Sequence, residues 1–229
     1  MHKLRIKAAV ILSLGLVVSS IIFVLGLSYT RSRTTAYVSV KGLAEREVDA
    51  NVGIWPIRFK AMESNLEQAN TQFKKQTEVL VAFLKQQGFV DKEIIYGVPE
   101  LRYHREHEEK SAKYYYSIEM EVLVHTSNVC LLYETVQKSQ ELIKLGVCLT
   151  HRWNGEAKFI FTDLNKIKPS MIQEATINAK KAAEQFTTDA NVRLSRLRRA
   201  SQGTFSIEDT HLPIKKRVRI VTQMEYAIQ

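Results

Sequence analysis

The first pattern in the chain is an uncharged run from Ala8 to Leu27, preceded by Lys3, Arg5 and Lys7. As a helix these 20 residues would be about 30 Å long, which matches the hydrocarbon core of a bilayer. The run is apolar on every face, whereas a helix of a soluble domain is apolar on one side only. The pattern therefore predicts one N-terminal transmembrane helix.

This run is longer than the apolar part of a cleaved signal peptide, and no small-x-small cleavage site follows it before Arg31. We therefore expect an uncleaved signal anchor, with a cleaved form secreted to the periplasm as the alternative. The basic residues ahead of the run keep the N-terminus in the cytoplasm. Residues 1–33 would be the cytoplasmic tip, anchor helix and linker of a single-pass inner-membrane protein. Residues 34–229 would be one domain, in the periplasm or outside the cell.

Alternating apolar and polar positions predict two long strands, at 114–124 and 218–228. The apolar rows are Tyr114, Tyr116, Ile118, Met120, Val122 and Val124, and Val218, Ile220, Met224, Tyr226 and Ile228. A strand with one solvated face favours antiparallel pairing. A third row runs from Val48 to Ile54 and then changes phase to Trp55, with Pro56 at the change. A bulge or an edge position would explain both features.

Three stretches carry apolar residues at helical spacing. They are Leu66 to Leu84 with Gly88 as its stop, Val129 to Ile143 ended by Gly146, and a third with Pro169 in its first turn. The third stripe is Ile172, Ala175, Ala179, Ala183, Phe186 and Ala190, and its alanines should let the helix lie close to a sheet. The predicted fold class is α+β, an antiparallel-rich sheet with three amphipathic helices packed on it, preceded by one transmembrane helix.

The distribution of charge adds one feature to this prediction, in the C-terminal segment. The chain has 33 Lys and Arg against 24 Asp and Glu, and much of the excess lies in the N-terminal leader and the C-terminal segment. The C-terminal basic residues are Arg196, Arg198, Arg199, Lys215, Lys216, Arg217 and Arg219. If their two segments pair as neighbouring strands, they form a stripe that attracts phosphate, including lipid headgroups. The alternative is a solvated strand edge protected by charge. We expect no nucleic-acid partner, because the anchor places these residues outside the cytoplasm.

Histidine and carboxylate residues cluster between two predicted strands, as His104, Glu106, His107, Glu108 and Glu109. These residue types bind divalent metals. Residues three apart on a strand point to opposite faces, however, so only a turn could bring the two histidines together. We interpret the cluster as the charged tip of a hairpin, and metal binding remains the alternative.

The two cysteines, Cys130 and Cys148, flank the second predicted helix. A helix of that length holds its ends about 20 Å apart, whereas bridged Cα atoms lie within about 7 Å. We therefore expect two buried free thiols. The sequence has no Cys-x-x-Cys and no Gly-x-Ser-x-Gly motif, so neither redox nor hydrolase chemistry is indicated.

Several segments resemble bacterial SIMPL-domain proteins, from about Tyr37 to Tyr226. They are Val40–Val48, Ile54–Pro56, Phe83–Phe89, Phe161–Asn165, Lys168–Ile172 and Arg198–Gly203. The similarity is to the membrane-anchored or secreted branch, although the commoner Gly-x-Gly followed by Pro-Asp is absent. The resemblance implies an α+β cell-envelope domain linked to assembly or stress tolerance, and it transfers no catalytic residue.

From these patterns we expect a non-catalytic envelope protein without cofactor that acts through its surface and assembles with copies of itself. The anchor has only Gly15 and Gly26, without a Gly-x-x-x-Gly pair, so self-association should involve the folded part. Two alternatives remain open, a binder of anionic lipid or polymer and an enzyme with an unrecognised metal-dependent site.

Overall fold

The computed structural model describes residues 19–20, 36–108, 111–150 and 156–229, and for 105–108 and 111–114 the backbone only. The predicted signal anchor therefore lies outside the described residues, except for Ser19 and Ser20. Among the helices of the described part, none is both long enough and apolar enough to cross a bilayer.

The chain divides into two compact units, and each is described by itself. The first contains residues up to Ala44, Ile172–Thr204 and Ile220–Gln229, and the second contains Glu45–Met171 and Phe205–Arg219. The sequence predicted one sheet, and this is wrong, because the structure has two antiparallel sheets. Alternation of apolar residues identifies the buried face of each strand but not the strand beside it, so two sheets give the same pattern as one.

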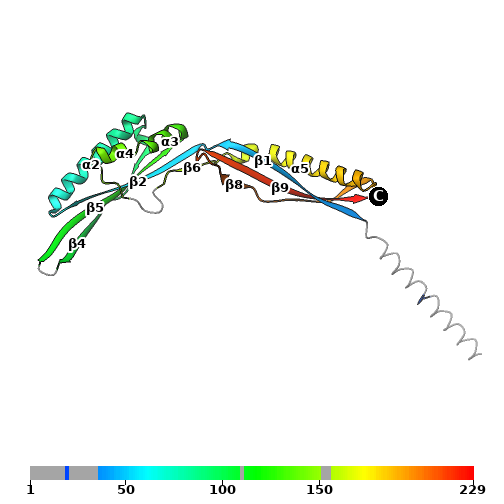
Figure 1. Ribbon diagram of the computed structural model, residues 1–229, viewed down its shortest axis with the longest axis horizontal. Coiled ribbons are helices and arrows are strands. Elements are labelled where there is room, and N and C mark those ends of the chain that lie inside the picture. Colours follow the sequence, from blue (N-terminus) through cyan, green and yellow to red (C-terminus); the bar gives the residue numbers. More distant parts are fainter. Residues whose placement is uncertain (1–18, 21–35, 109–110, 151–155) are drawn as a thin grey trace, which may run out of the picture. The chain divides into compact units, whose positions relative to one another are not determined.

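The second unit holds a five-stranded sheet (Figure 1). Its strands are β2 (Val52–Glu63), β3 (Ile94–Tyr96), β4 (Glu100–Glu108), β5 (Ser111–Thr126) and β6 (Lys158–Ile160). The order is β3-β5-β2-β6, and β4 also pairs with β5. The alternation predicted for β5 is confirmed from Ile118 to Val124, since Ile118, Met120, Val122 and Val124 are buried. Tyr116 is half-buried, and the side chain of Tyr114 lies outside the described residues.

Helices cover one face of this sheet. They are α2 (Leu66–Gln87), α3 (Val129–Gln137) and α4 (Gln140–Lys144), with a short 3-10 turn, η1 (Asp91–Glu93). Phe59, Leu80 and Leu132 are fully buried in the shared core. The prediction for α2 is confirmed, including its stop at Gly88, whose φ of 111° suits glycine.

The second predicted helix, 129–143, is two helices, because α3 ends at Gln137 and α4 begins at Gln140. Five polar residues separate Val136 from Leu142, so no apolar side chain holds the middle turn against the sheet. The end at Gly146 is confirmed, with its N–H donating to the Ile143 carbonyl.

The third predicted row, from Val48 to Phe59, is not one strand. It is the end of β1 (Tyr37–Asp49) and the start of β2, with the break at Ala50 and Asn51. The register with β5 runs without a shift across Pro56, which excludes a bulge on that side. On the other side of β2, the Arg58 carbonyl accepts a hydrogen bond from the Thr150 N–H. Backbone groups two residues apart on a strand point to the same side, so the Pro56 nitrogen also points to this side, beyond the last residue of β2 that pairs with β6. Proline is tolerated there because no ladder N–H is needed.

The four-stranded sheet has the order β1-β9-β7, with β8 also paired to β9. Its other strands are β7 (Leu194–Gln202), β8 (Ser206–Asp209) and β9 (Lys215–Ile228). The alternation predicted for 218–228 is confirmed from Val218 to Tyr226.

The long helix α5 (Leu164–Asp189) contributes Ala179 and Ala183 to the core of the first unit, with Val40, Met224 and Tyr226. The sequence predicts Pro169 in the first turn of this helix, whereas α5 begins five residues earlier, at Leu164. Its buried stripe continues from Ala183 to Thr187, and Phe186 is 61% exposed, contrary to the prediction. A stripe spaced by four residues reaches position 187 rather than 186.

Candidate functional site

The candidate site is the outer edge of the five-stranded sheet, formed by β4. The register of β4 with β5 runs from Glu100 opposite Glu119 to Glu108 opposite Ser111, which confirms the predicted hairpin. No described strand pairs with β4 on its other side. An open strand edge is a template for pairing with another chain unless it is blocked.

Hydrogen bonding determines which residues of β4 turn their backbone outward. The Gly97 N–H donates to the Glu121 carbonyl at 2.8 Å, so Glu121 turns its backbone groups towards this edge of β5. Glu119 does the same, because direction alternates along a strand. Its neighbour Glu100 therefore turns its backbone inward. Leu101 is one residue further along, so it turns its N–H and C=O to the open edge.

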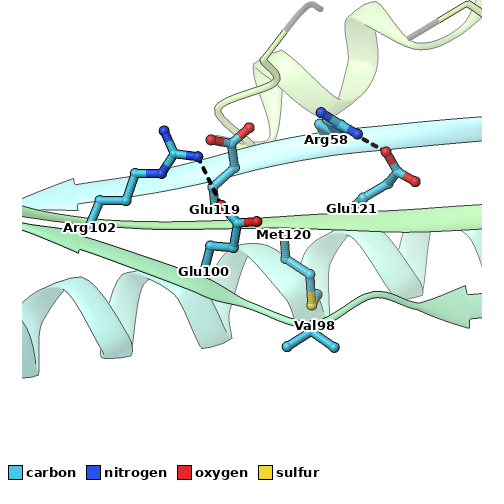
Figure 2. A pocket seen from close by; sticks show the side chains of 7 residues that line it. All are labelled: Arg58, Val98, Glu100, Arg102, Glu119, Met120 and Glu121. Carbon is cyan, nitrogen blue, oxygen red and sulfur yellow. Dashed lines mark hydrogen bonds and ion pairs between the residues drawn. The ribbon is translucent and has the colours of Figure 1, made fainter. Parts of the chain in front are cut away.

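The face of the edge away from α2 is charged, and it is hollowed by a pocket of about 190 Å³ (Figure 2). Arg58 Nε donates to Glu121 at 2.5 Å, and an Arg102 amino group donates to Glu100 at 2.9 Å. Glu119 lines the same pocket.

The two arginines of this pocket are held in the charged state. The pKa of Arg58 is raised by its hydrogen bond and attraction to Glu121, and the pKa of Arg102 is raised likewise by Glu100. The pocket therefore presents paired charges of both signs, which suit contact with another charged surface. Within the described part of the chain, no group of three or more His, Cys, Asp or Glu side chains is arranged to hold a metal ion.

The opposite face of the edge is apolar. A groove of about 640 Å³ lies between the start of α2 and the hairpin, and its apolar walls are Leu66, Phe73, Pro99, Leu101 and Ile118. Leu66 is 44% exposed and Leu101 is 55% exposed. Apolar side chains grouped beside an open strand edge are typical of an interaction surface.

Tyr103 extends the apolar face along β4 beyond Leu101. It is 58% exposed, and its ring lies 5.2 Å from that of Tyr116 across the strand pair. Residues two apart on a strand share a face, so Tyr103 lies on the same side of the sheet as Leu101.

A second cavity of about 280 Å³ lies where β2 lacks a neighbour beside Pro56. Trp55, Tyr133 and Phe159 contribute aromatic walls. The rings of Tyr133 and Phe159 meet edge to face at 6.0 Å. Thr150 and Glu156 also line the cavity, and residues 151–155 between them lie outside the described part, so we assign no ligand to it.

The predicted basic stripe does not form by pairing of its two segments. Arg199 lies opposite Glu225 on β9, whereas Arg217 lies opposite Glu208 on β8. The two segments pair with different partners because β7 aligns with the end of β9 and β8 with its beginning. Arg196 is exposed on β7, and Arg198 lies over the ring of Tyr37 at 5.0 Å.

Acidic side chains compensate most of the charge at the start of β9. Lys215 pairs with Glu47 at 3.5 Å and Asp49 at 3.2 Å. These carboxylates raise the pKa of Lys215, first through the hydrogen bond to Asp49.

Two more cations of this segment have acidic partners. Lys216 pairs with Asp209, and Arg219 pairs with Glu45 at 3.4 Å. This part of the basic surface is therefore largely neutralised by its own chain.

The histidine cluster is only partly described. His104 Nε2 lies 2.9 Å from Ser117 Oγ, and its ring stacks on Tyr115 at 4.7 Å. The side chains of Glu106, His107 and Glu108, and the whole of Glu109, lie outside the described residues. His104 is thus engaged with β5 within the hairpin.

Cys130 and Cys148 are free thiols, and both are exposed. The expectation that they are buried is wrong. Cys130 follows the buried Val129 on α3 and so falls on the outer face of the helix. Cys148 similarly follows the buried Val147.

The open edge at β4 was not predicted from the sequence. Glu100, Arg102 and His104 alternate with Leu101 and Tyr103, which is the pattern of a strand with one polar and one apolar face. That signal could have identified the strand. It could not have shown that the strand lies at the edge of a sheet, which depends on the pairing order.

Comparison with known proteins identifies one family. The SIMPL model, described as a protein of unknown function (DUF541), matches residues 38–225. A search of curated proteins gives no match. The matched range covers both compact units and extends from β1 to β9. The chain therefore belongs to the SIMPL (DUF541) family.

Proposed function

We propose that this SIMPL-family chain is a non-catalytic protein of the cell envelope that assembles with copies of itself. Residues 8–27 anchor it in the inner membrane, and the folded part acts outside the cytoplasm in tolerance of envelope stress. The observation that carries the assembly proposal is the open edge of β4, with exposed apolar side chains on one face and ion pairs on the other.

Physical arguments support an interaction role for this edge. A monomeric protein that exposes a strand edge is liable to pair through it, and natural edges are usually short, charged or covered. The nine residues of β4 combine length with an apolar face, and Leu101 and Tyr103 are each more than half exposed. An anchor would also hold many copies in one plane, which raises their effective concentration.

The alternative of an anionic-lipid binder has weaker support. Lys215, Lys216 and Arg219 already have acidic partners in their own chain. A phosphate would have to compete with those carboxylates. Arg196 and Arg217 remain exposed, but they lie on different strands. Arg196 is on β7, which pairs with the end of β9, whereas Arg217 is near the beginning of β9, opposite Glu208 of β8.

The anchor makes a prediction about the mature chain. We expect its intact mass to include residues 8–27, because no cleavage site follows the apolar run. A reporter fused after Gln229 should be active only outside the cytoplasm. A mature N-terminus near Ser20 or Ser28 would show that the segment is removed and that the chain is secreted.

Assembly makes a separate prediction about the intact protein. The chain has a mass of 26.3 kDa, and the full-length protein extracted in a mild detergent should form particles whose protein mass is a multiple of this value. Light scattering corrected for bound detergent measures that mass. Particles that contain a single chain across the accessible concentration range would refute the proposal.

A further inference from the structure

We propose that two copies of this chain pair antiparallel through β4, with Leu101 of each copy facing Leu101 of the other across a two-fold axis. The inference rests on the proposed self-assembly and names its surface and register. Three observations carry it, namely the outward backbone of Leu101, the alternating charges of β4 and the apolar groove beside Pro99.

The two-fold symmetry restricts the registers to a short set. In an antiparallel pair of identical strands, one residue faces its own copy, and residues before it face residues equally far after it. The described side chains of β4 are Glu100 to His104, and a centre at Glu100 would set two glutamates opposite each other. The registers left to compare have Leu101, Arg102, Tyr103 or His104 at the centre. Each of these four choices sets different residues opposite one another.

Charge selects among the four registers. With Leu101 at the centre, Glu100 of each copy lies opposite Arg102 of the other. With Arg102 at the centre, two arginines face each other. A centre at Tyr103 sets Glu100 opposite Glu106, and a centre at His104 sets Glu100 opposite Glu108. Opposite charges across a strand pair stabilise it and like charges destabilise it, so the register centred on Leu101 is favoured.

The backbone and the apolar face agree with this choice. Leu101 turns its N–H and C=O to the open edge, so the two copies of Leu101 can exchange two hydrogen bonds at the axis. The same register sets Tyr103 of one copy opposite Pro99 of the other. Pro99 and Leu101 line the apolar groove, so pairing covers exposed apolar surface on both copies.

The register can be tested in the full-length chain in detergent. In a Cys130→Ser, Cys148→Ser background, four variants carry one new cysteine each, namely Leu101→Cys, Arg102→Cys, Tyr103→Cys and His104→Cys. Only the residue on the axis faces its own copy, at about 5.5 Å between Cα atoms, which a disulfide can span. In the Leu101 register, a cysteine at position 103 is four residues out of register with its copy, or about 13 Å.

We expect Leu101→Cys to form a covalent dimer under mild oxidation at least about tenfold faster than the other three variants. Faster cross-linking of Arg102→Cys, Tyr103→Cys or His104→Cys would overturn the register. If none cross-links while the particle mass is still a multiple of the chain, assembly uses another surface. If none cross-links and the particle holds one chain, the proposed function fails as well.

A charge-reversal mixture separates contacts between copies from the pair within one chain. Glu100→Arg and Arg102→Glu, each added to the Leu101→Cys variant, place like charges opposite each other in their own dimers. We expect each alone to cross-link about tenfold more slowly. Mixed together, the two variants set opposite charges across the axis, so cross-linking between them should recover. The ion pair within each chain remains broken in that mixture, so failure to recover would overturn the inference.

Discussion

Replacing Gly42 with alanine should lower the free energy of unfolding by about 3 kcal/mol. A Cβ at this position of β1 would lie 1.9 Å from the carbonyl oxygen of Ala175 and 2.4 Å from the backbone nitrogen of Ala179. Both are backbone atoms of α5, so rotation of a side chain cannot relieve the overlap. The helix would have to move away from the strand and lose the contacts of its alanine stripe.

The measurement is a thermal or urea melt of the variant beside the wild type. For a chain of this size the loss corresponds to about 10 °C in melting temperature. Gly146→Ala is the control, because no neighbouring atom lies within 4 Å of a Cβ added there. Gly146 has a φ of 89°, so this substitution strains the backbone without causing an overlap. Gly146→Ala should lower the free energy of unfolding by only about 1 kcal/mol, the cost of placing alanine in the left-handed conformation. If both variants lose the same free energy of unfolding, the close approach of α5 is not the reason that glycine is needed at position 42.

The elements that sequence predicted well are those with a complete pattern of their own. The strand that contains Ile118 and Val122 alternates between buried and partly exposed positions from Ile118 to Val124. Helix α2 has a capping residue, a stripe and a stop, and the Asn65 side chain accepts from the Glu67 N–H. The alanines of α5 predict that this helix packs close to a sheet. The structure confirms this, because the backbone of α5 leaves no room for a Cβ at Gly42 of β1. These elements can be predicted because the residues that define them are close together in the sequence.

The errors arise where partners are distant in sequence. The sequence places Lys215 in a basic patch, yet its acidic partners, Glu47 and Asp49, precede it by more than 160 residues. The division into two sheets and the position of β4 at an edge are set by pairing order. Apolar periodicity carries no information on that order, so the candidate site became visible only with the topology.

The second large effect concerns assembly through the folded part rather than the anchor. A fragment that begins at Thr34 retains β4, its apolar groove and its ion pairs. We expect it to remain associated at tens of micromolar. A Leu101→Asp substitution in the fragment should separate the copies, because it would place two carboxylates opposite each other at the axis.

Sedimentation of the Thr34–Gln229 fragment tests the central claim most directly. Self-assembly through an open sheet edge predicts a particle of two or more chains whose mass falls to that of one chain in the Leu101→Asp variant. A fragment that is strictly monomeric at tens of micromolar, while the full-length protein is oligomeric, would show that the anchor drives assembly and would contradict the claim.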